Sequence, residues 1–107
     1  MKTPEEELRR TILEDLSKVI DPETGADVVR MKLVEDLVVD ASGQVSYTFR
    51  PSSPLCPIAV YLAVQIRMTV AGVPGVSGQR IKVTNYVAAE KLTELINQEE
   101  LFDLEEG

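Results

Sequence analysis

The fold is decided around one stretch, which reads Phe49-Arg50-Pro51-Ser52-Ser53-Pro54-Leu55-Cys56-Pro57-Ile58-Ala59. Apolar and polar side chains alternate from Tyr47 to Arg50, leading into the start of this stretch, and this pattern is typical of a strand. From Ile58 onward, apolar residues recur at helical spacing. The stretch therefore marks the passage from a strand to a helix, and it holds Cys56, the only cysteine of the chain.

Cys56 is predicted to cap the helix that follows it. Pro57 disfavours a helical conformation for the residue before it and is well suited to the first helical position. The thiol would then face free backbone N–H groups and the positive end of the helix dipole, which favour the thiolate. The alternative is a buried, inert cysteine, because free cysteines are often buried. The position alone does not separate the two.

Upstream, the chain predicts a helix and a turn. Thr3-Pro4-Glu5-Glu6 is typical of a helix start, with Thr3 as the cap. Apolar residues then recur at helical spacing as far as Ile20, and the helix should stop there because Asp21 precedes a proline. The segment Asp21-Pro22-Glu23-Thr24-Gly25 is a turn by composition. The simplest role of Asp21 in this turn is a capping or Asx-turn contact.

A β-hairpin follows, made of a strand from Leu33 to Asp40, a tight turn that ends at Gly43, and a partner strand up to Arg50. Glu35 falls on the apolar face of the first strand and does not fit it. Downstream, a helix is predicted from Pro57 to about Ala71, stopped by Gly72-Val73-Pro74-Gly75.

A third strand around Ile81 to Val83 and a last helix, capped by Asn85, complete the pattern. The order α-β-β-α-β-α predicts an α+β fold: a small three-stranded mixed sheet with helices on one face. Residues 1–107 are expected to form a single domain, with an acidic tail from about residue 99.

Composition excludes several classes of function. The net charge is −7, which argues against nucleic acid and anionic membrane as partners. There is no histidine, so Ser-His-Asp and Cys-His sites and histidine-containing zinc sites are excluded. No apolar run approaches the ~20 residues of a membrane span, and the first residues show no signal core. A cytoplasmic protein is expected.

Two motifs together resemble the PaaD/SufT-like family of metal–sulfur (iron–sulfur) cluster assembly proteins. The first is a strand followed by Ser52-Ser53-Pro54-Leu55-Cys56-Pro57, in the pattern Ser/Thr-x-Pro-x-Cys-Pro, and an apolar helix. The second is Val19-Ile20-Asp21-Pro22-Glu23-Thr24-Gly25. The resemblance runs from about Leu13 to about Val83. It departs from the family at Lys32, where the family usually has a glycine, and again beyond the third strand.

The resemblance implies an α+β fold and an accessory or adaptor role in iron–sulfur cluster assembly or delivery, rather than an enzyme. It makes Cys56 a metal ligand for a transiently held iron–sulfur cluster and places Asp21 and Glu23 near it as binding residues. One cysteine cannot supply the four thiolates of an ordinary cluster. The other ligands would come from client apo-proteins, scaffold proteins, a small thiol or a second protomer.

Self-association is expected for a second reason. The helix after Cys56 is apolar on more than one face, and its extra stripe is Tyr61, Val64 and Met68. This stripe predicts at least a homodimer, unless the C-terminal segment covers it.

Two other functions remain open at this point. One is a metal-free protein-interaction module in which Cys56 is structural and the hairpin, the Asp21 turn and the acidic tail form a docking surface. The other is a thiol enzyme, whose base would have to be Asp21, Glu23 or a lysine.

Overall fold

The computed structural model describes residues 3–98 of the chain. Their elements follow the predicted order α-β-β-α-β-α, and the α+β class with a three-stranded mixed sheet is confirmed. The predicted acidic tail from about residue 99 lies outside the described residues. The elements are α1 (Pro4–Leu16), β1 (Val34–Val39), β2 (Gln44–Phe49), α2 (Ala59–Ala71), β3 (Gly78–Val83) and α3 (Ala89–Ile96).

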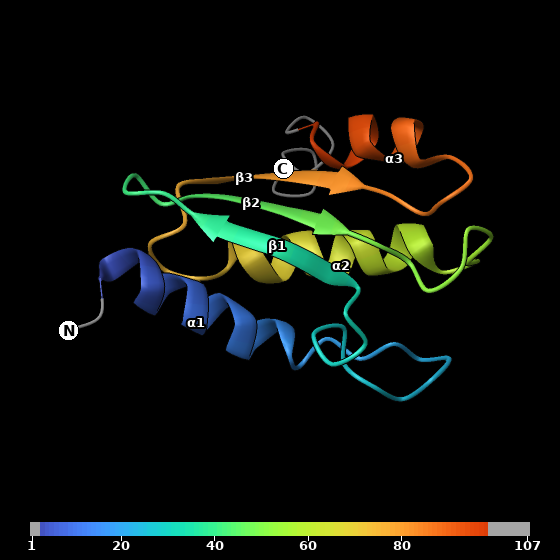
Figure 1. The fold of residues 1–107 in the computed structure, drawn as a ribbon, viewed down its shortest axis with the longest axis horizontal. Coiled ribbons are helices and arrows are strands. Elements are labelled where there is room, and N and C mark those ends of the chain that lie inside the picture. The colour runs from blue at the N-terminus through green and yellow to red at the C-terminus, as the bar shows by residue number, and fades with distance from the viewer. Residues whose placement is uncertain (1–2, 99–107) are drawn as a thin grey trace, which may run out of the picture.

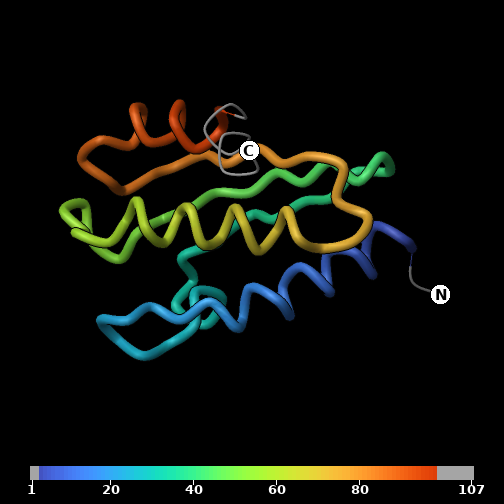
Figure 2. Tube along the Cα trace, turned by 180° about the vertical axis from the view of Figure 1, so that it is seen from behind, coloured from blue at the N-terminus to red at the C-terminus, as the bar shows by residue number. Residues whose placement is uncertain are grey.

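The sheet has the strand order β1-β2-β3, with β1 antiparallel and β3 parallel to the central strand β2. Helix α2 connects the two parallel strands and lies across one face of the sheet: β1 and β2 pass in front of it in Figure 1, and it passes in front of them in Figure 2. The core fills the space between this face and the helices. Its largest fully buried apolar side chains are Phe49, Ile12, Leu16, Leu62, Ile66, Ile81 and Ile96.

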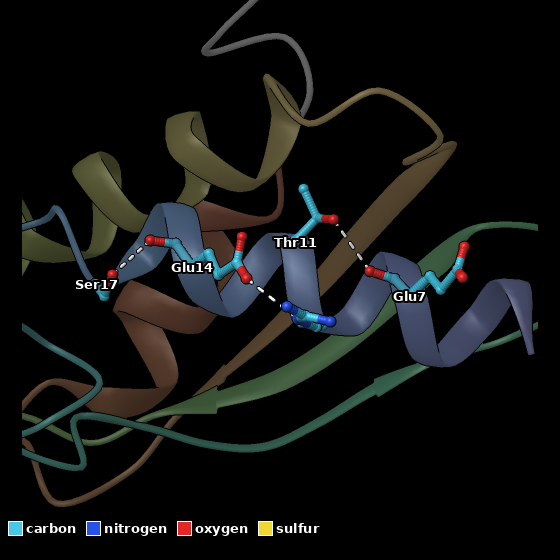
Figure 3. A network of polar contacts seen from close by, with 5 residues as sticks. Glu7, Thr11, Glu14 and Ser17 are labelled. Atoms are coloured by element: carbon cyan, nitrogen blue, oxygen red, sulfur yellow. Dashed lines mark hydrogen bonds and ion pairs between the residues drawn. The ribbon is translucent and has the colours of Figure 1, made fainter. Parts of the chain in front are cut away.

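Helix α1 begins as the sequence predicts, because the Thr3 hydroxyl accepts a hydrogen bond from the Glu6 amide at 3.2 Å. It ends at Leu16, earlier than the predicted stop at Ile20, and the Ser17 hydroxyl donates to the carbonyl of Glu14 just before the end. The side of α1 drawn in Figure 3 carries such local polar contacts, including the Arg10–Glu14 ion pair at 3.2 Å. The opposite side contributes Ile12 and Leu16 to the core.

A β-bulge in β1 explains the mismatch at Glu35. Asp36 has φ 54, and the register shifts between Glu35 and Val38. A bulge adds one residue to a strand, so the alternation of side chains changes phase across it. Glu35 therefore lies opposite Thr48 on the face away from the helices, while Leu37 is buried. The prediction that Glu35 shares the apolar face was wrong for this reason.

Side chains cover backbone groups at both edges of the sheet. Along β3, the Val83 amide donates to the Thr93 hydroxyl at 2.9 Å, and the Asn97 amide group bonds both the N–H and the C=O of Ile81. At the bulge of β1, Arg9 Nε donates to the Leu37 carbonyl at 2.9 Å. These contacts satisfy edge groups that would otherwise be open to pairing with another chain.

Helix α2 stops as predicted, with Gly72 as its C-cap. Helix α3 begins at Ala89 with Ala88 as its N-cap and no side-chain cap, so the prediction that Asn85 caps it was wrong. None of the helices among residues 3–98 is both long enough and apolar enough to span a bilayer.

Candidate functional site

Three connections gather at one end of the molecule. Figure 1 shows the β2–α2 connection, the β3–α3 connection and the segment that follows α1 at the same end of the long axis. The hairpin turn between β1 and β2 lies at the other end. The β2–α2 connection contains Cys56, and the segment after α1 contains Asp21 and Glu23. Both motifs of the family resemblance therefore belong to this end.

The structure places Cys56 one turn before α2, not at its cap. The helix begins at Ala59, and its N-cap is Ile58, which makes no side-chain capping bond. The Cys56 amide donates to the Ser53 carbonyl at 3.1 Å, and its own carbonyl accepts from Ala59 at 3.3 Å. Two successive tight turns therefore separate β2 from α2. The predicted cap position was wrong because Pro57 fits a turn as well as the first position of a helix.

The Cys56 side chain is buried, with 4% of its surface exposed, and it belongs to the main core cluster. The residues before it, 52–55, are all exposed, and Leu55 is 74% exposed. The loop thus carries its thiol inward and a large apolar side chain outward. This arrangement corresponds to the buried alternative for Cys56 in the described conformation.

The β3–α3 connection fixes the cysteine loop from the side. The Asn85 side chain donates to the Pro51 carbonyl and the Val87 amide to the Pro54 carbonyl, both at 2.9 Å. Asn85 has φ 52, a left-handed conformation that asparagine tolerates better than most residues. Sequence reasoning missed this residue as a support of the site, because a contact across 34 positions leaves no local signal.

Asp21 is also buried, with 1% of its surface exposed. Its carboxylate Oδ1 accepts a hydrogen bond from the Glu23 amide at 2.8 Å, which is the Asx-turn contact expected for an aspartate before Pro22. Its backbone closes the same turn, because its amide donates to Ala26 and its carbonyl accepts from Gly25. Glu23 is exposed, and its side chain makes no hydrogen bond or ion pair within residues 3–98.

An open groove runs between the end of α1 and the length of α2, from Tyr61 in its first turn to Thr69 in its last. Ile20, which directly precedes Asp21, and Tyr61, in the first turn of α2, both line it, whereas Asp21, Glu23 and Cys56 do not. Tyr61 and Met68 of the predicted dimer stripe are half-exposed, whereas Val64 packs partly against the core. The groove is lined by Asp15, Lys18, Val19, Ile20, Tyr61, Gln65 and Thr69.

The donor set at this end is small. Within residues 3–98, no three side chains of the metal-ligating types Cys, Asp and Glu stand close enough together to hold a metal ion. Cys56 can supply one soft ligand, and Glu23 one exposed carboxylate.

The model of the iron–sulfur cluster assembly protein family matches residues 9–83. The chain belongs to this family. The match confirms the resemblance found in the sequence, and it spans both Asp21 and Cys56. It ends with β3, so Asn85 and α3 lie beyond the matched segment.

Named members of the family are similar over most of their length. The Fe-S protein maturation auxiliary factor YitW of Bacillus subtilis is 32% identical over 79 residues, which are 74% of this chain and 78% of that protein. A Fe-S protein maturation auxiliary factor of Porphyromonas gingivalis is 36% identical over 73 residues, which are 68% of this chain and 70% of that protein.

A solved structure has the same fold. The crystal structure of a domain of unknown function, DUF59, from Bacillus anthracis aligns with a TM-score of 0.69 at 28% identity. The alignment covers 75% of this chain and 76% of that one.

Proposed function

We propose that this chain is an accessory factor in iron–sulfur cluster assembly or delivery, in which the Cys56 thiolate transiently binds iron of the cluster it passes on. The main support is the family match, which spans the segment holding the only cysteine. The cluster is the cargo of this reaction. The role suits an adaptor better than an enzyme with its own turnover.

The chemistry proposed for Cys56 is ligand exchange. The sulfur forms a bond to iron as one thiolate of the donor leaves, and the proton lost by the Cys56 thiol passes to that departing thiolate. No oxidation state changes in this step. Because Cys56 supplies one of the four thiolates of an ordinary cluster, the others come from the client apo-protein, a scaffold protein, a small thiol or a second protomer.

Binding iron requires the cysteine loop to move. With 4% of its surface exposed, Cys56 is not reachable by a ligand as large as a cluster. The hydrogen bonds from the Asn85 side chain and the Val87 backbone amide hold the loop as far as Pro54. We therefore assign the movement to the following residues, 55–58. Their exposed Leu55 offers a partner an apolar side chain to contact.

Asp21 and Glu23 are proposed as binding residues beside Cys56. Glu23 is exposed and can offer a carboxylate oxygen to iron or to a partner. One carboxylate oxygen of Asp21 already accepts a hydrogen bond from the Glu23 backbone amide, so Asp21 also orients Glu23. The exposed Tyr61 and Met68 are the proposed contact between two copies, which would bring a second cysteine to the same assembly.

Anaerobic cluster loading tests the proposal. The wild type, Cys56→Ser and the matched loop control Ser52→Ala are each mixed with a cluster donor, re-isolated and analysed for iron, sulfide and visible absorption. Ser52 is an exposed neighbour in the same loop. We expect cluster on the wild type and on Ser52→Ala but not on Cys56→Ser. Equal loading of all three proteins would contradict the role of the thiol.

A second candidate is a metal-free interaction module, and one observation favours it. Leu55 and Val87 are 74% and 73% exposed on two connections that are bonded to each other, while the thiol is buried. Exposed apolar side chains of this kind suit a protein partner. If this function is the right one, Leu55→Ser weakens client binding and Cys56→Ser leaves client maturation unchanged.

A further inference from the structure

The face of the sheet away from α1 and α2 is positively charged, whereas the chain as a whole is negatively charged. Opposite residues on neighbouring strands share a face, so Ser46 and Thr48 of β2 lie in rows with Arg80 and Lys82 of β3. Arg50 joins them through its ion pair with Glu35 at 3.8 Å. We call this surface the basic face; it consists of Glu35, Val38, Ser46, Thr48, Arg50, Arg80 and Lys82.

The basic face carries three cations and one carboxylate on a chain whose net charge is −7. Within residues 3–98, the side chains of Arg80 and Lys82 make no ion pair or hydrogen bond. The face also has an apolar point, because Val38 of β1 is 60% exposed. These features suit an acidic segment with some apolar side chains.

The described chain ends next to this face. Asn97 is held to the middle of β3, with its side chain bonded to both backbone groups of Ile81 at 2.9 and 2.7 Å. Arg80 and Lys82 flank Ile81 in sequence and point to the other side of the sheet from its buried side chain. A groove lined by Arg80, Lys82, Thr93 and Asn97 begins at this point.

We propose that the acidic segment 99–107 of this chain docks on the basic face. The segment contains the five carboxylates of Glu99, Glu100, Asp103, Glu105 and Glu106, together with Leu101, Phe102 and Leu104. It starts two residues after Asn97 and carries the charge that the face lacks. Its apolar side chains match the exposed Val38.

Reach and charge both favour this docking. Nine residues can span up to ~30 Å, whereas three strands spaced ~4.8 Å apart extend over roughly 10 Å. Glu90 and Glu94 line the α3 side of the groove and repel an acidic segment, which directs it toward the sheet. The docked segment covers the one large face of the sheet that no helix covers, and keeps acidic partners away from it.

Zero-length cross-linking tests the proposal on the full chain. A carbodiimide joins a lysine to a carboxylate only when the two are in contact, and Lys82 is the lysine of the basic face. Equal amounts of ¹⁵N-labelled and unlabelled protein are mixed before the reaction, so that mass spectrometry separates links within one chain from links between two. We expect a link within one chain between Lys82 and segment 99–107.

One variant, a change of salt concentration and a control variant make the test specific. Arg80→Glu on the basic face and moderate salt should each lower the yield of the link at least about threefold, because screened surface attraction holds the segment. Arg30→Glu makes the same charge change at an exposed residue away from the face and should leave the yield unchanged.

The proposal would be overturned by no link to Lys82, by links only between two chains, or by an equal loss of yield in Arg30→Glu. A segment that links mainly to Lys91 of α3 would also contradict docking on the sheet.

Discussion

Asp21 and Asp40 begin two turns of the same local design at opposite ends of the molecule. In each, the aspartate Oδ1 accepts the backbone amide two residues further on, at 2.8 Å in the first turn and 2.9 Å in the second. Each turn also contains a left-handed glycine, Gly25 with φ 76 and Gly43 with φ 87. The sequence predicts both turns for the same reasons.

The two turns differ in what surrounds them. Asp40 is exposed, and hydrogen bonds, the strongest from the Ser42 hydroxyl, lower the pKa of its carboxyl group. Asp21 is buried, although a carboxylate in a turn has no need of burial and burial of a charge is costly. The packing around the two glycines differs in the opposite sense, because it is tight in the turn of the exposed Asp40 and open in the turn of the buried Asp21. A Cβ at Gly43 would lie 2.3 Å from the Gly75 carbonyl oxygen, whereas one at Gly25 would meet nothing within 4 Å.

The comparison separates a structural turn from a candidate functional one. Packing of its glycine and hydrogen bonds to its aspartate explain the Asp40 turn completely. The Asp21 turn is loosely packed around its glycine, and yet it holds a carboxylate away from water at the end of the molecule that contains Cys56. That contrast supports the proposed role of Asp21.

The largest expected effect on folding comes from the two glycines. Gly43→Ala should lower the free energy of unfolding by about 3 kcal/mol, because the left-handed conformation costs ~1–2 kcal/mol and the clash with Gly75 forces a backbone shift that costs a similar amount. Gly25→Ala should cost only the conformational part, about 1 kcal/mol. Urea unfolding of both variants measures the difference. Equal losses would mean that the two turns are packed alike.

The next effect concerns the two aspartates. Asp21→Asn and Asp40→Asn both keep an oxygen that accepts the turn hydrogen bond, so both proteins should fold. If the Asp21 carboxylate serves the site, only Asp21→Asn should slow transfer of a cluster to an apo-client, by roughly tenfold, which corresponds to ~1.4 kcal/mol. Transfer is followed by the regained activity of the client. Normal transfer by Asp21→Asn would reduce Asp21 to a turn residue like Asp40.

The smallest effect tests a third left-handed position, Lys32, which has φ 59. A lysine bears the conformational cost that glycine avoids at positions such as 25 and 43. Lys32→Gly should therefore raise the free energy of unfolding by about 0.5 kcal/mol, after the greater freedom of glycine in the unfolded chain is subtracted. The urea midpoint decides the sign. A lower midpoint would show that the Lys32 side chain contributes more than its backbone conformation costs.

The same position shows how far the sequence predicted the site. The departure from the family glycine at residue 32 was visible in the sequence, but its meaning, a left-handed residue before β1, required the backbone. The Asp21 turn, the hairpin turn and the stop of α2 at Gly72 were predictable, because each depends on neighbouring residues only.

Features that depend on distant residues were not predictable. Cys56 is buried as part of the core cluster that all three helices and the sheet form together, and the support from Asn85 comes from a loop 34 positions away. The bulge at Asp36 left one trace, the misplaced Glu35, but the alternation of the strand could not say where the extra residue lay. Local composition fixes turns, whereas the access to a side chain is a property of the assembled core.

The central claim, that the Cys56 sulfur takes part in cluster transfer, is tested most directly by client activation per folded protein. The variants are Cys56→Ser, Cys56→Ala and the loop control Ser52→Ala. Because Cys56 is buried, an unpaired serine hydroxyl should cost roughly 1–3 kcal/mol of stability, and alanine serves as the variant without a new polar group. Both Cys56 variants should remain folded by circular dichroism and fail to activate the client, while Ser52→Ala should activate it normally. A folded Cys56→Ala protein that activates the client at the wild-type rate would contradict the claim.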